Sequence, residues 1–195
     1  HWSEMPGIRL AELLGFRMNL FKLLNPLMCL LKQNEGRLIR NHALGALGQG
    51  VLTRKAFRMM GIPNSKIVDL YYTPASLEKK EPSTRIVEFA SGRKIFLTVA
   101  ALNKRKGIDV LLKAFSKSTT KEWCLVLCGL DKSKGLYKRL VKKLEIADQV
   151  LFLGAYPVNE ISKVYSASNV FVLPSRFDGW GAVLNEAASL RLPLI

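Results

Sequence analysis

Cysteine and histidine are scarce in this chain, with three and two copies among its 195 residues. So few cysteines form no disulfide framework of the kind that small secreted domains use. Cys124 and Cys128 lie in the apolar run W-C-L-V-L-C, a pattern typical of a buried strand. A metal-binding pair is the alternative, but no histidine or further cysteine stands nearby in the sequence. We therefore expect two small apolar side chains in a reducing compartment, and we assign no role to His1 or His42.

Long apolar runs are also missing. No uncharged stretch reaches the roughly eighteen apolar residues that a membrane-spanning helix needs, so we expect no such helix. We expect a cytoplasmic location. The composition is nevertheless 49% hydrophobic, which favours a folded core over disorder. The length suits about one to one and a half domains. Because the chain opens on His1 and stops at Ile195 within an apparent strand, we expect a fragment of a longer enzyme.

Negative charge is in short supply, since 15 acidic residues face 30 basic ones, for a net charge of +15. Residues 1–75 hold 10 basic and 4 acidic side chains, and residues 76–195 hold 20 and 11. Such a surface attracts nucleotides, phosphorylated substrates, anionic lipid or nucleic acid, although solubility alone also explains it. No zinc-finger spacing, aromatic–basic repeat or basic arm is present, which disfavours nucleic acid as a partner.

From Lys94 onward, strand-like runs alternate with helical patterns. We expect strands at 95–100, 123–128, 150–153 and 170–173, and helices at 108–115, 136–144, 160–166 and 183–190. This alternation predicts βαβ units and an α/β fold with a doubly wound parallel sheet. Ligands of such sheets bind beyond the carboxyl ends of the strands. The loops 101–107, 129–134, 154–158 and 175–181 fall there.

The last of these loops has the composition of an anion site. Its glycines let backbone N–H groups approach a ligand, and the helix that follows has unpaired N–H groups that favour phosphate. Glu186 lies one turn inside this helix, where a carboxylate suits the hydroxyls of a ribose better than a phosphate. The candidate ligand-binding residues of this stretch are Gly179, Trp180, Gly181, Ala182 and Val183.

The run D-G-W-G-A-V-L-N-E-A-A-S-L-R-L-P-L-I resembles the motif E-G-F-G-x-x-x-x-E-A-x-A-x-G-x-P-V-I of family-four retaining glycosyltransferases with the two-domain GT-B fold. Asp178 stands in place of the first glutamate and is one methylene shorter. The small residue that usually precedes the proline of the motif is replaced in the run Leu190–Arg191–Leu192. The resemblance implies a Rossmann-like donor-binding domain at 76–195, truncated at its end.

The loop after the first strand of this domain resembles a second family motif, G-R-L-x-x-x-K-G, whose Arg and Lys hold the donor diphosphate. Lys106 and Gly107 match, but Ala101 stands at the arginine position, so we expect Arg105 to supply the missing charge. A solvated charge run is the alternative. The resemblance implies that Lys106 and Asp178 are catalytic and that no metal cofactor is needed. Lys106 would stabilise the leaving diphosphate, with Asp178 on the sugar side.

A third match concerns the nucleobase. The run L-F-L-G-A-Y resembles the family's F-L-G loop, which passes the base, so Tyr156 is a candidate for stacking on it. An ordinary surface tyrosine is the alternative.

The run G-I-P-N-S-K-I at residues 61–67, with the strand expected after it, resembles the family's G-V-P-x-x-K-I, which closes the N-terminal domain. The resemblance implies that residues 1–75 are the incomplete end of this acceptor-side α/β domain. Leucines at helical spacing from Leu10 to Leu31, with interspersed basic residues, predict a basic amphipathic helix that packs on its own domain or lies on an anionic membrane. We expect a loop at 42–50, a helix at 51–60 and a strand at 68–72. A linker at 73–85 then follows.

These patterns favour a retaining glycosyltransferase of the hexosyltransferase type. It would move a sugar from a nucleotide-sugar donor to a saccharide acceptor, lipid-linked, in bacterial surface polysaccharide or lipopolysaccharide biosynthesis, with the enzyme peripheral at the inner face of the membrane. The alternatives are a GT-B epimerase or synthase, a non-catalytic nucleotide-binding module and a basic nucleic-acid binder. A dehydrogenase is disfavoured because no G-x-G-x-x-G follows the first strand of the 76–195 domain.

Overall fold

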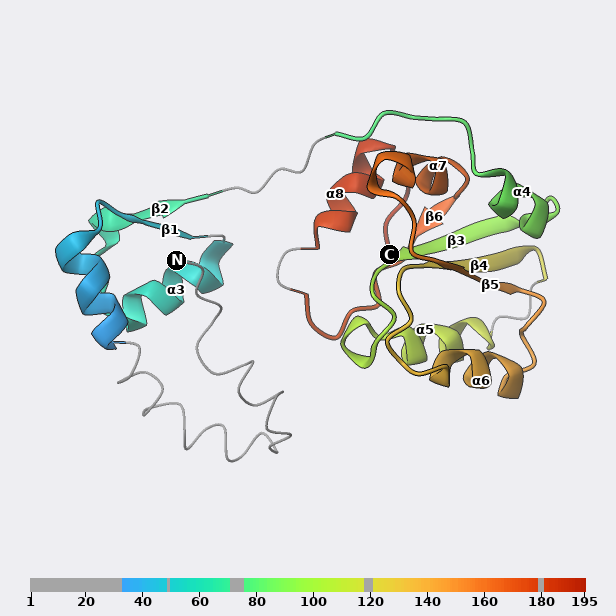
Figure 1. Cartoon of the computed structure of the whole chain (residues 1–195), viewed down its shortest axis with the longest axis horizontal. Coiled ribbons are helices and arrows are strands. Elements are labelled where there is room, and N and C mark those ends of the chain that lie inside the picture. Colours follow the sequence, from blue (N-terminus) through green and yellow to red (C-terminus); the bar gives the residue numbers. More distant parts are fainter. Residues whose placement is uncertain (1–32, 49, 71–75, 118–120, 179–180) are drawn as a thin grey trace. The chain divides into compact units, whose positions relative to one another are not determined.

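A computed structural model gives the fold of the protein (Figure 1). It describes residues 33–48, 50–70, 76–117, 121–178 and 181–195. The chain divides into two compact units, His1–Tyr72 and Thr73–Ile195. The boundary drawn from the sequence lies after residue 75, and the assignment of the first unit to an acceptor-side domain stays a prediction. The amphipathic helix expected between Leu10 and Leu31 lies outside the described residues.

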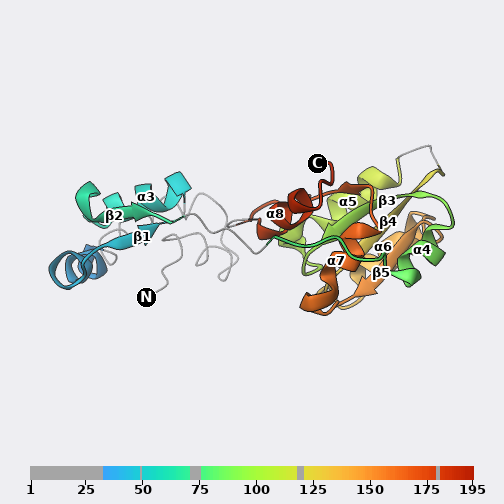
Figure 2. The same cartoon turned by 90° about the horizontal axis from the view of Figure 1, so that it is seen from above.

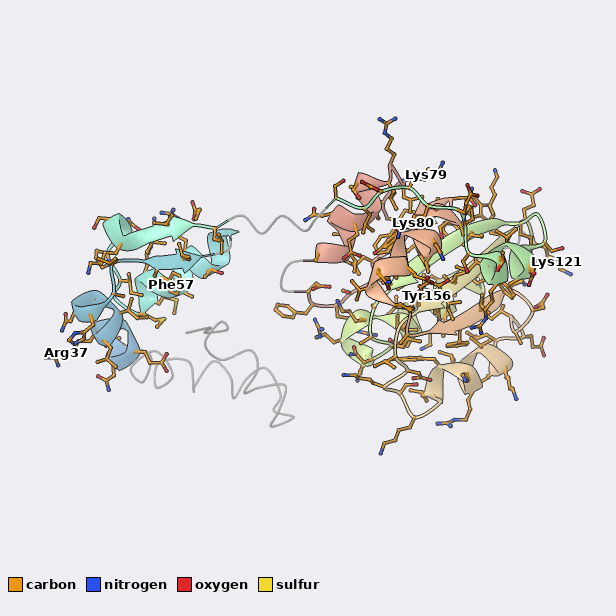
Figure 3. All side chains as sticks on the ribbon, turned by 45° about the horizontal axis from the view of Figure 1, so that its top comes forward. Arg37, Phe57, Lys79, Lys80, Lys121 and Tyr156 are labelled. Atoms are coloured by element: carbon orange, nitrogen blue, oxygen red, sulfur yellow. The ribbon has the colours of Figure 1, made fainter. Side chains whose placement is uncertain are left out.

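The first unit contains a small parallel sheet with helices. Residues 33–42 are helical, and β1 (Ala46–Gly48), α3 (Gly50–Met59), a short 3₁₀ turn (Asn64–Lys66) and β2 (Ile67–Asp69) follow. β1 and β2 pair in parallel. The loop expected at 42–50 is therefore wrong at β1, whose three residues are too short to show a strand period. A small core is formed by Ala46, Met60, Ile62 and Ile67, with Ile39 and Phe57 packed against it (Figure 3).

The second unit is built on four parallel strands in the order β5-β4-β3-β6. They are β3 (Lys94–Val99), β4 (Trp123–Cys128), β5 (Val150–Gly154) and β6 (Val170–Phe171). β3, β4 and β5 run side by side in both views (Figures 1 and 2). The end of the chain continues the sheet, because Leu194 bridges Phe171 in parallel.

Helices cover both faces of this sheet, which confirms the predicted doubly wound α/β fold. They are α4 (Thr84–Ala90), α5 (Ile108–Phe115), α6 (Leu136–Lys143), α7 (Ile161–Ser166) and α8 (Ala182–Ser189). Buried residues of α4, α7 and α8 share one core cluster, and those of α5 and α6 share another. Figure 1 shows α5 and α6 together on one side of the strands, and α7 and α8 on the other.

β4 is the central buried strand of the two core clusters. Cys124, Val126 and Cys128 belong to one core cluster, and Leu125 and Leu127 belong to the other, so the strand is buried on both faces. Burial raises the pKa of the Cys128 thiol to about 11, which keeps it protonated at neutral pH. Both thiols therefore pack as apolar side chains.

The linker expected at 73–85 is wrong at its end, because α4 begins at Thr84. Ser83, before the helix, is buried, and Ile86 is fully buried in the sheet core. A helix of seven residues shows too little periodicity to be recognised in the sequence. Among the described residues, no helix is long and apolar enough to cross a membrane.

Candidate functional site

The strand order reverses between β3 and β6. From β3 the chain builds β4 and β5 on one side and then returns to add β6 on the other. In open α/β sheets, ligands bind outside the carboxyl ends of the strands at such a reversal. Here the loops at these ends are residues 100–107, after β3, and residues 172–181, after β6.

The two loops approach each other closely. Gly107 has a φ of +67°, and a Cβ added there would lie 1.9 Å from the carbonyl oxygen of Pro174. The backbone N–H of Arg176 donates to the carbonyl oxygen of Arg105 at 2.9 Å. In return, Nη1 of Arg105 donates to the carbonyl oxygen of Phe177 at 3.1 Å. The loop after β6 is therefore fixed directly on the predicted basic loop.

An ion pair strengthens this junction. Arg176 donates from Nη1 and Nη2 to the two carboxylate oxygens of Asp109, each at 2.7 Å, and from Nη1 to the carbonyl oxygen of Lys104 at 2.5 Å. The hydrogen bond from Arg176, aided by its charge, lowers the pKa of Asp109. The sequence analysis missed both residues. No local pattern links side chains 67 positions apart.

Lys106 and Asp178, the two predicted catalytic residues, are brought together. Nζ of Lys106 donates to Oδ2 of Asp178, and the two side chains are only 12% and 22% exposed. Burial on its own would raise the pKa of Asp178. The hydrogen bond and the charge of Lys106, with the backbone N–H of Gly181, outweigh burial and lower it. An ion pair of Lys106 and Asp178 therefore joins the loops after β3 and β6.

Glu186 lies in α8 and is held from inside the domain. The hydroxyl of Tyr165, in α7, donates to Oε2 of Glu186 at 2.7 Å. Burial, followed by this contact, strongly raises the pKa of Tyr165, so the phenol stays a neutral donor. The sequence analysis gave Tyr165 no role. Its signal there is that of a core residue, and it is indeed fully buried.

The start of α8 faces the loop that carries Asp178. Gly181 has a φ of +69° and is followed by Ala182 and Val183, the first residues of the helix. Both are half-buried, and Val183 packs against the sheet core. Gly179 and Trp180, also predicted to bind the donor, lie outside the described residues.

Tyr156 lies against α4. Its hydroxyl donates to Oγ of Ser83 at 3.4 Å, and its ring packs against the core cluster that contains Tyr165. Figure 3 labels it beside the helices of that face. Its stacking on a nucleobase stays a prediction.

No group of three or more His, Cys, Asp or Glu side chains suited to a metal ion occurs within the described parts of the chain. Independence of metal stays a prediction.

Comparisons with known proteins agree with this architecture. An uncharacterized glycosyltransferase of Haemophilus influenzae is 34% identical over 104 residues, which cover 52% of this chain and 29% of that protein. The D-inositol 3-phosphate glycosyltransferase of Corynebacterium diphtheriae is 28% identical over 132 residues, or 64% and 31% of the two chains. The O-antigen biosynthesis glycosyltransferase WclY of Escherichia coli is 30% identical over 96 residues, or 49% and 26%. The chain thus spans about a third of the length of these relatives.

Solved structures share the fold at low sequence identity. HepE of Anabaena, in complex with UDP and glucose, aligns over 85% of this chain and 47% of its own, with a TM-score of 0.69 and 17% identity. WaaG, a glycosyltransferase involved in lipopolysaccharide biosynthesis, aligns over 76% and 42%, with a TM-score of 0.60 and 20% identity. The second unit thus has the architecture of GT-B glycosyltransferases. Residues 79–195 match the model of the family described as glycosyl transferases group 1, so the chain belongs to that family.

Proposed function

We propose that the complete protein transfers a glycosyl residue from a nucleotide-diphosphate sugar to a saccharide acceptor, with retention of anomeric configuration. The observation that carries this proposal is the pairing of Lys106 with Asp178, from the loops that follow the neighbouring strands β3 and β6. A partly buried cation beside the N-terminus of α8 suits a diphosphate, and the adjacent carboxylate suits a sugar hydroxyl.

Lys106 and α8 are proposed to hold the diphosphate. An ammonium group has three donors, so Lys106 can keep its contact with Asp178 and still donate to a phosphate oxygen. As the glycosidic bond breaks, the leaving group gains negative charge, and a fixed cation stabilises that charge more in the transition state than before. Arg105, whose guanidinium lies over the same loop at Phe177, is proposed to add a second cation.

Glu186 is proposed to bind the ribose of the donor. Tyr165 engages one of its carboxylate oxygens, which fixes the direction of the other. A carboxylate accepts hydrogen bonds at both oxygens, so the second can receive a ribose hydroxyl. Tyr165 then acts as a positioning residue that never touches the donor.

The transfer step is proposed to occur on one face of the sugar. The bond from the anomeric carbon to the diphosphate oxygen breaks while the bond to the acceptor oxygen forms on the same side. The acceptor proton passes to the leaving phosphate. Asp178 accepts a sugar hydroxyl and favours positive charge at the anomeric carbon, and cationic side chains take the place of a metal.

The acceptor is proposed to be a lipid-linked saccharide of a bacterial surface polysaccharide, used at the cytoplasmic face of the membrane. Support comes from two similar proteins: WclY is an O-antigen biosynthesis glycosyltransferase, and WaaG is a glycosyltransferase involved in lipopolysaccharide biosynthesis. The lipid-linked acceptor is proposed here by analogy with these pathways.

The test has a binding arm and a reaction arm. In the first, the chain is heated with UDP, GDP or ADP and with the matching nucleosides, and a diphosphate is expected to raise Tm more than its nucleoside. In the second, the complete protein is incubated with the selected nucleotide sugar and a lipid-linked saccharide acceptor, and the products are resolved by chromatography. A glycosylated acceptor is expected. An isomerised nucleotide sugar would indicate an epimerase instead, and failure of every diphosphate to stabilise the chain would contradict the proposal.

A further inference from the structure

Positive charge is concentrated on α6 and the turn before it. The stretch from Lys132 to Leu144 contains no acidic residue. All six of its basic side chains are exposed, and we call them the α6 basic surface: Lys132, Lys134, Lys138, Arg139, Lys142 and Lys143. Figure 3 shows nitrogen-tipped side chains projecting from the α6 ribbon.

Carboxylates do not neutralise this surface. The ion pairs of the second unit, among its described residues, join Lys106 to Asp178, Lys163 to Glu160 and Arg176 to Asp109, and none involves the α6 basic surface. Its contacts with other groups are uncharged: Nη1 of Arg139 donates to the carbonyl oxygen of Lys134 at 3.3 Å, and Nζ of Lys138 lies 6.0 Å from the ring centre of Phe152.

The opposite helix layer is electrically balanced. α4, α7 and α8 together carry the cations Arg85 and Lys163 and the carboxylates Glu88 and Glu186. Charge that served solubility alone would need no such segregation. Residues 76–195 carry 20 basic and 11 acidic side chains, and the stretch from Lys132 to Leu144 holds six of those cations with no acid.

The surface also has features that favour lipid over nucleic acid. Leu136, inside the stretch, is 52% exposed, and Leu130, just before it, is 59% exposed. The only aromatic residue of the stretch, Tyr137, is 2% exposed and packs into the sheet core, so it offers no platform on which bases could stack. Clustered cations with neighbouring exposed apolar side chains are typical of binding to an anionic membrane surface.

We propose that the α6 basic surface docks the second unit onto anionic phospholipid headgroups. The surface begins at the carboxyl edge of the sheet, where the candidate site lies. The backbone N–H of Lys132 donates to the carbonyl oxygen of Leu102 at 3.1 Å, and Asp131 bridges Leu102. A membrane bound to α6 therefore lies beside the loop that leads to Lys106. This docking does not depend on the proposed transfer reaction.

The test is co-sedimentation of the chain with vesicles, using one variant and one matched control. The variant replaces Lys138, Arg139, Lys142 and Lys143 with Gln. The control removes the same charge from exposed positions flanking or within the opposite layer, replacing Lys79, Lys80, Arg85 and Arg191 with Gln (Figure 3). Vesicles are phosphatidylcholine alone or mixed with phosphatidylglycerol, and Tm confirms that each variant is folded.

The chain and the control are expected to bind the phosphatidylglycerol vesicles and not the neutral ones, with binding weakened by salt. Each cation near an anionic surface contributes a factor of about five, so the α6 variant is expected to lose at least about tenfold in partitioning. Equal losses for both variants, unchanged binding of the α6 variant, or no binding of the parent chain would each overturn the proposal. Preference for a duplex or single-stranded oligonucleotide over the anionic vesicles would overturn it in favour of nucleic acid.

Discussion

The hydroxyl of Tyr165 donates a hydrogen bond of 2.7 Å to Oε2 of Glu186, joining α7 to α8 beneath the candidate donor site. Tyr165 is fully buried, while Glu186 is half-buried. The contact ties the orientation of the Glu186 carboxylate to the packing of the core. Tyr165 is therefore a core residue that also orients a side chain of the candidate site.

Replacing Tyr165 with Phe preserves the ring and removes this donor. We expect affinity for a nucleoside diphosphate to fall by about 0.5–1.5 kcal/mol, the usual contribution of one hydrogen bond, because Glu186 is no longer held toward the ribose. A 2′,3′-dideoxy analogue should show no loss, since it has no hydroxyl for Glu186 to bind. Calorimetric titration of both ligands checks this. Tyr137→Phe, at a buried tyrosine of the other core cluster, is the control and should change neither affinity. Equal losses for both ligands in Tyr165→Phe would contradict the assigned role.

The role of Lys106 can be tested by comparing a charged ligand, the nucleoside diphosphate, with the uncharged nucleoside. Lys106→Met keeps the length of the side chain and removes the ammonium group. We expect diphosphate binding to weaken by about 1–3 kcal/mol, the scale of charge-assisted hydrogen bonds, with little change for the bare nucleoside. Lys104→Met removes an exposed cation two positions earlier and is the matched control. The assignment would be wrong if nucleoside and diphosphate lost affinity alike.

Asp178 is expected to act on the reaction more than on binding. In the complete protein, Asp178→Asn should reduce turnover by about 10²–10³-fold, the scale for one preorganised electrostatic group. Free nucleoside diphosphate should bind at least as tightly, because the substitution removes a negative charge from beside Lys106. Steady-state rates and calorimetry measure the two effects separately. An unchanged turnover would show that this short carboxylate does not reach the sugar.

Elements with strong periodic signals could be predicted from the sequence. β4 and α5 have the predicted bounds, since one is a continuous buried run and the other a clear amphipathic helix. β1 and α4 were missed because three and seven residues carry too little pattern. The roles of Lys106 and Asp178 were suggested by motifs, but their direct contact was not.

The contacts that shape the site were beyond the reach of local patterns. Arg176 contacts Asp109 only because β6 lies next to β3 in the sheet, which brings the loops after these two strands together. Tyr165 and Glu186 meet because neighbouring helices pack on the same face of the sheet. Each pairing depends on strand order, which a single sequence specifies only through the complete fold.

The loss of folding stability at acid pH should depend on the ion pair between Arg176 and Asp109. The pKa of Asp109 is lowered in the folded chain, so the unfolded chain binds more protons. The stabilisation is therefore present above the unfolded value of about 3.9 and is lost as the pH falls through the lower folded value. Urea midpoints measured from neutral pH down into this range should decline less steeply in Asp109→Asn. Arg176→Gln should flatten the curve in the same way, and the double variant should add little to either. Additive effects of the two substitutions would show that the pair does not act as a unit.

Gly107 tests how closely the two site loops approach. Its φ is +67°, and an added Cβ would meet the carbonyl oxygen of Pro174 at 1.9 Å. Gly92 is the matched control, because its φ is +83° and a Cβ there would have nothing within 4 Å. Gly92→Ala should cost only the backbone strain of a left-handed residue, about 1 kcal/mol. Gly107→Ala carries the same strain and must also push Pro174 away, so it should destabilise the chain by at least about 2 kcal/mol more.

Because Pro174 leads into the loop of Asp178, the Gly107 variant should also bind nucleoside diphosphate more weakly, while Gly92→Ala leaves binding unchanged. Urea unfolding and calorimetry of the two variants make the comparison, and equal behaviour would mean that the loops are not held at this contact.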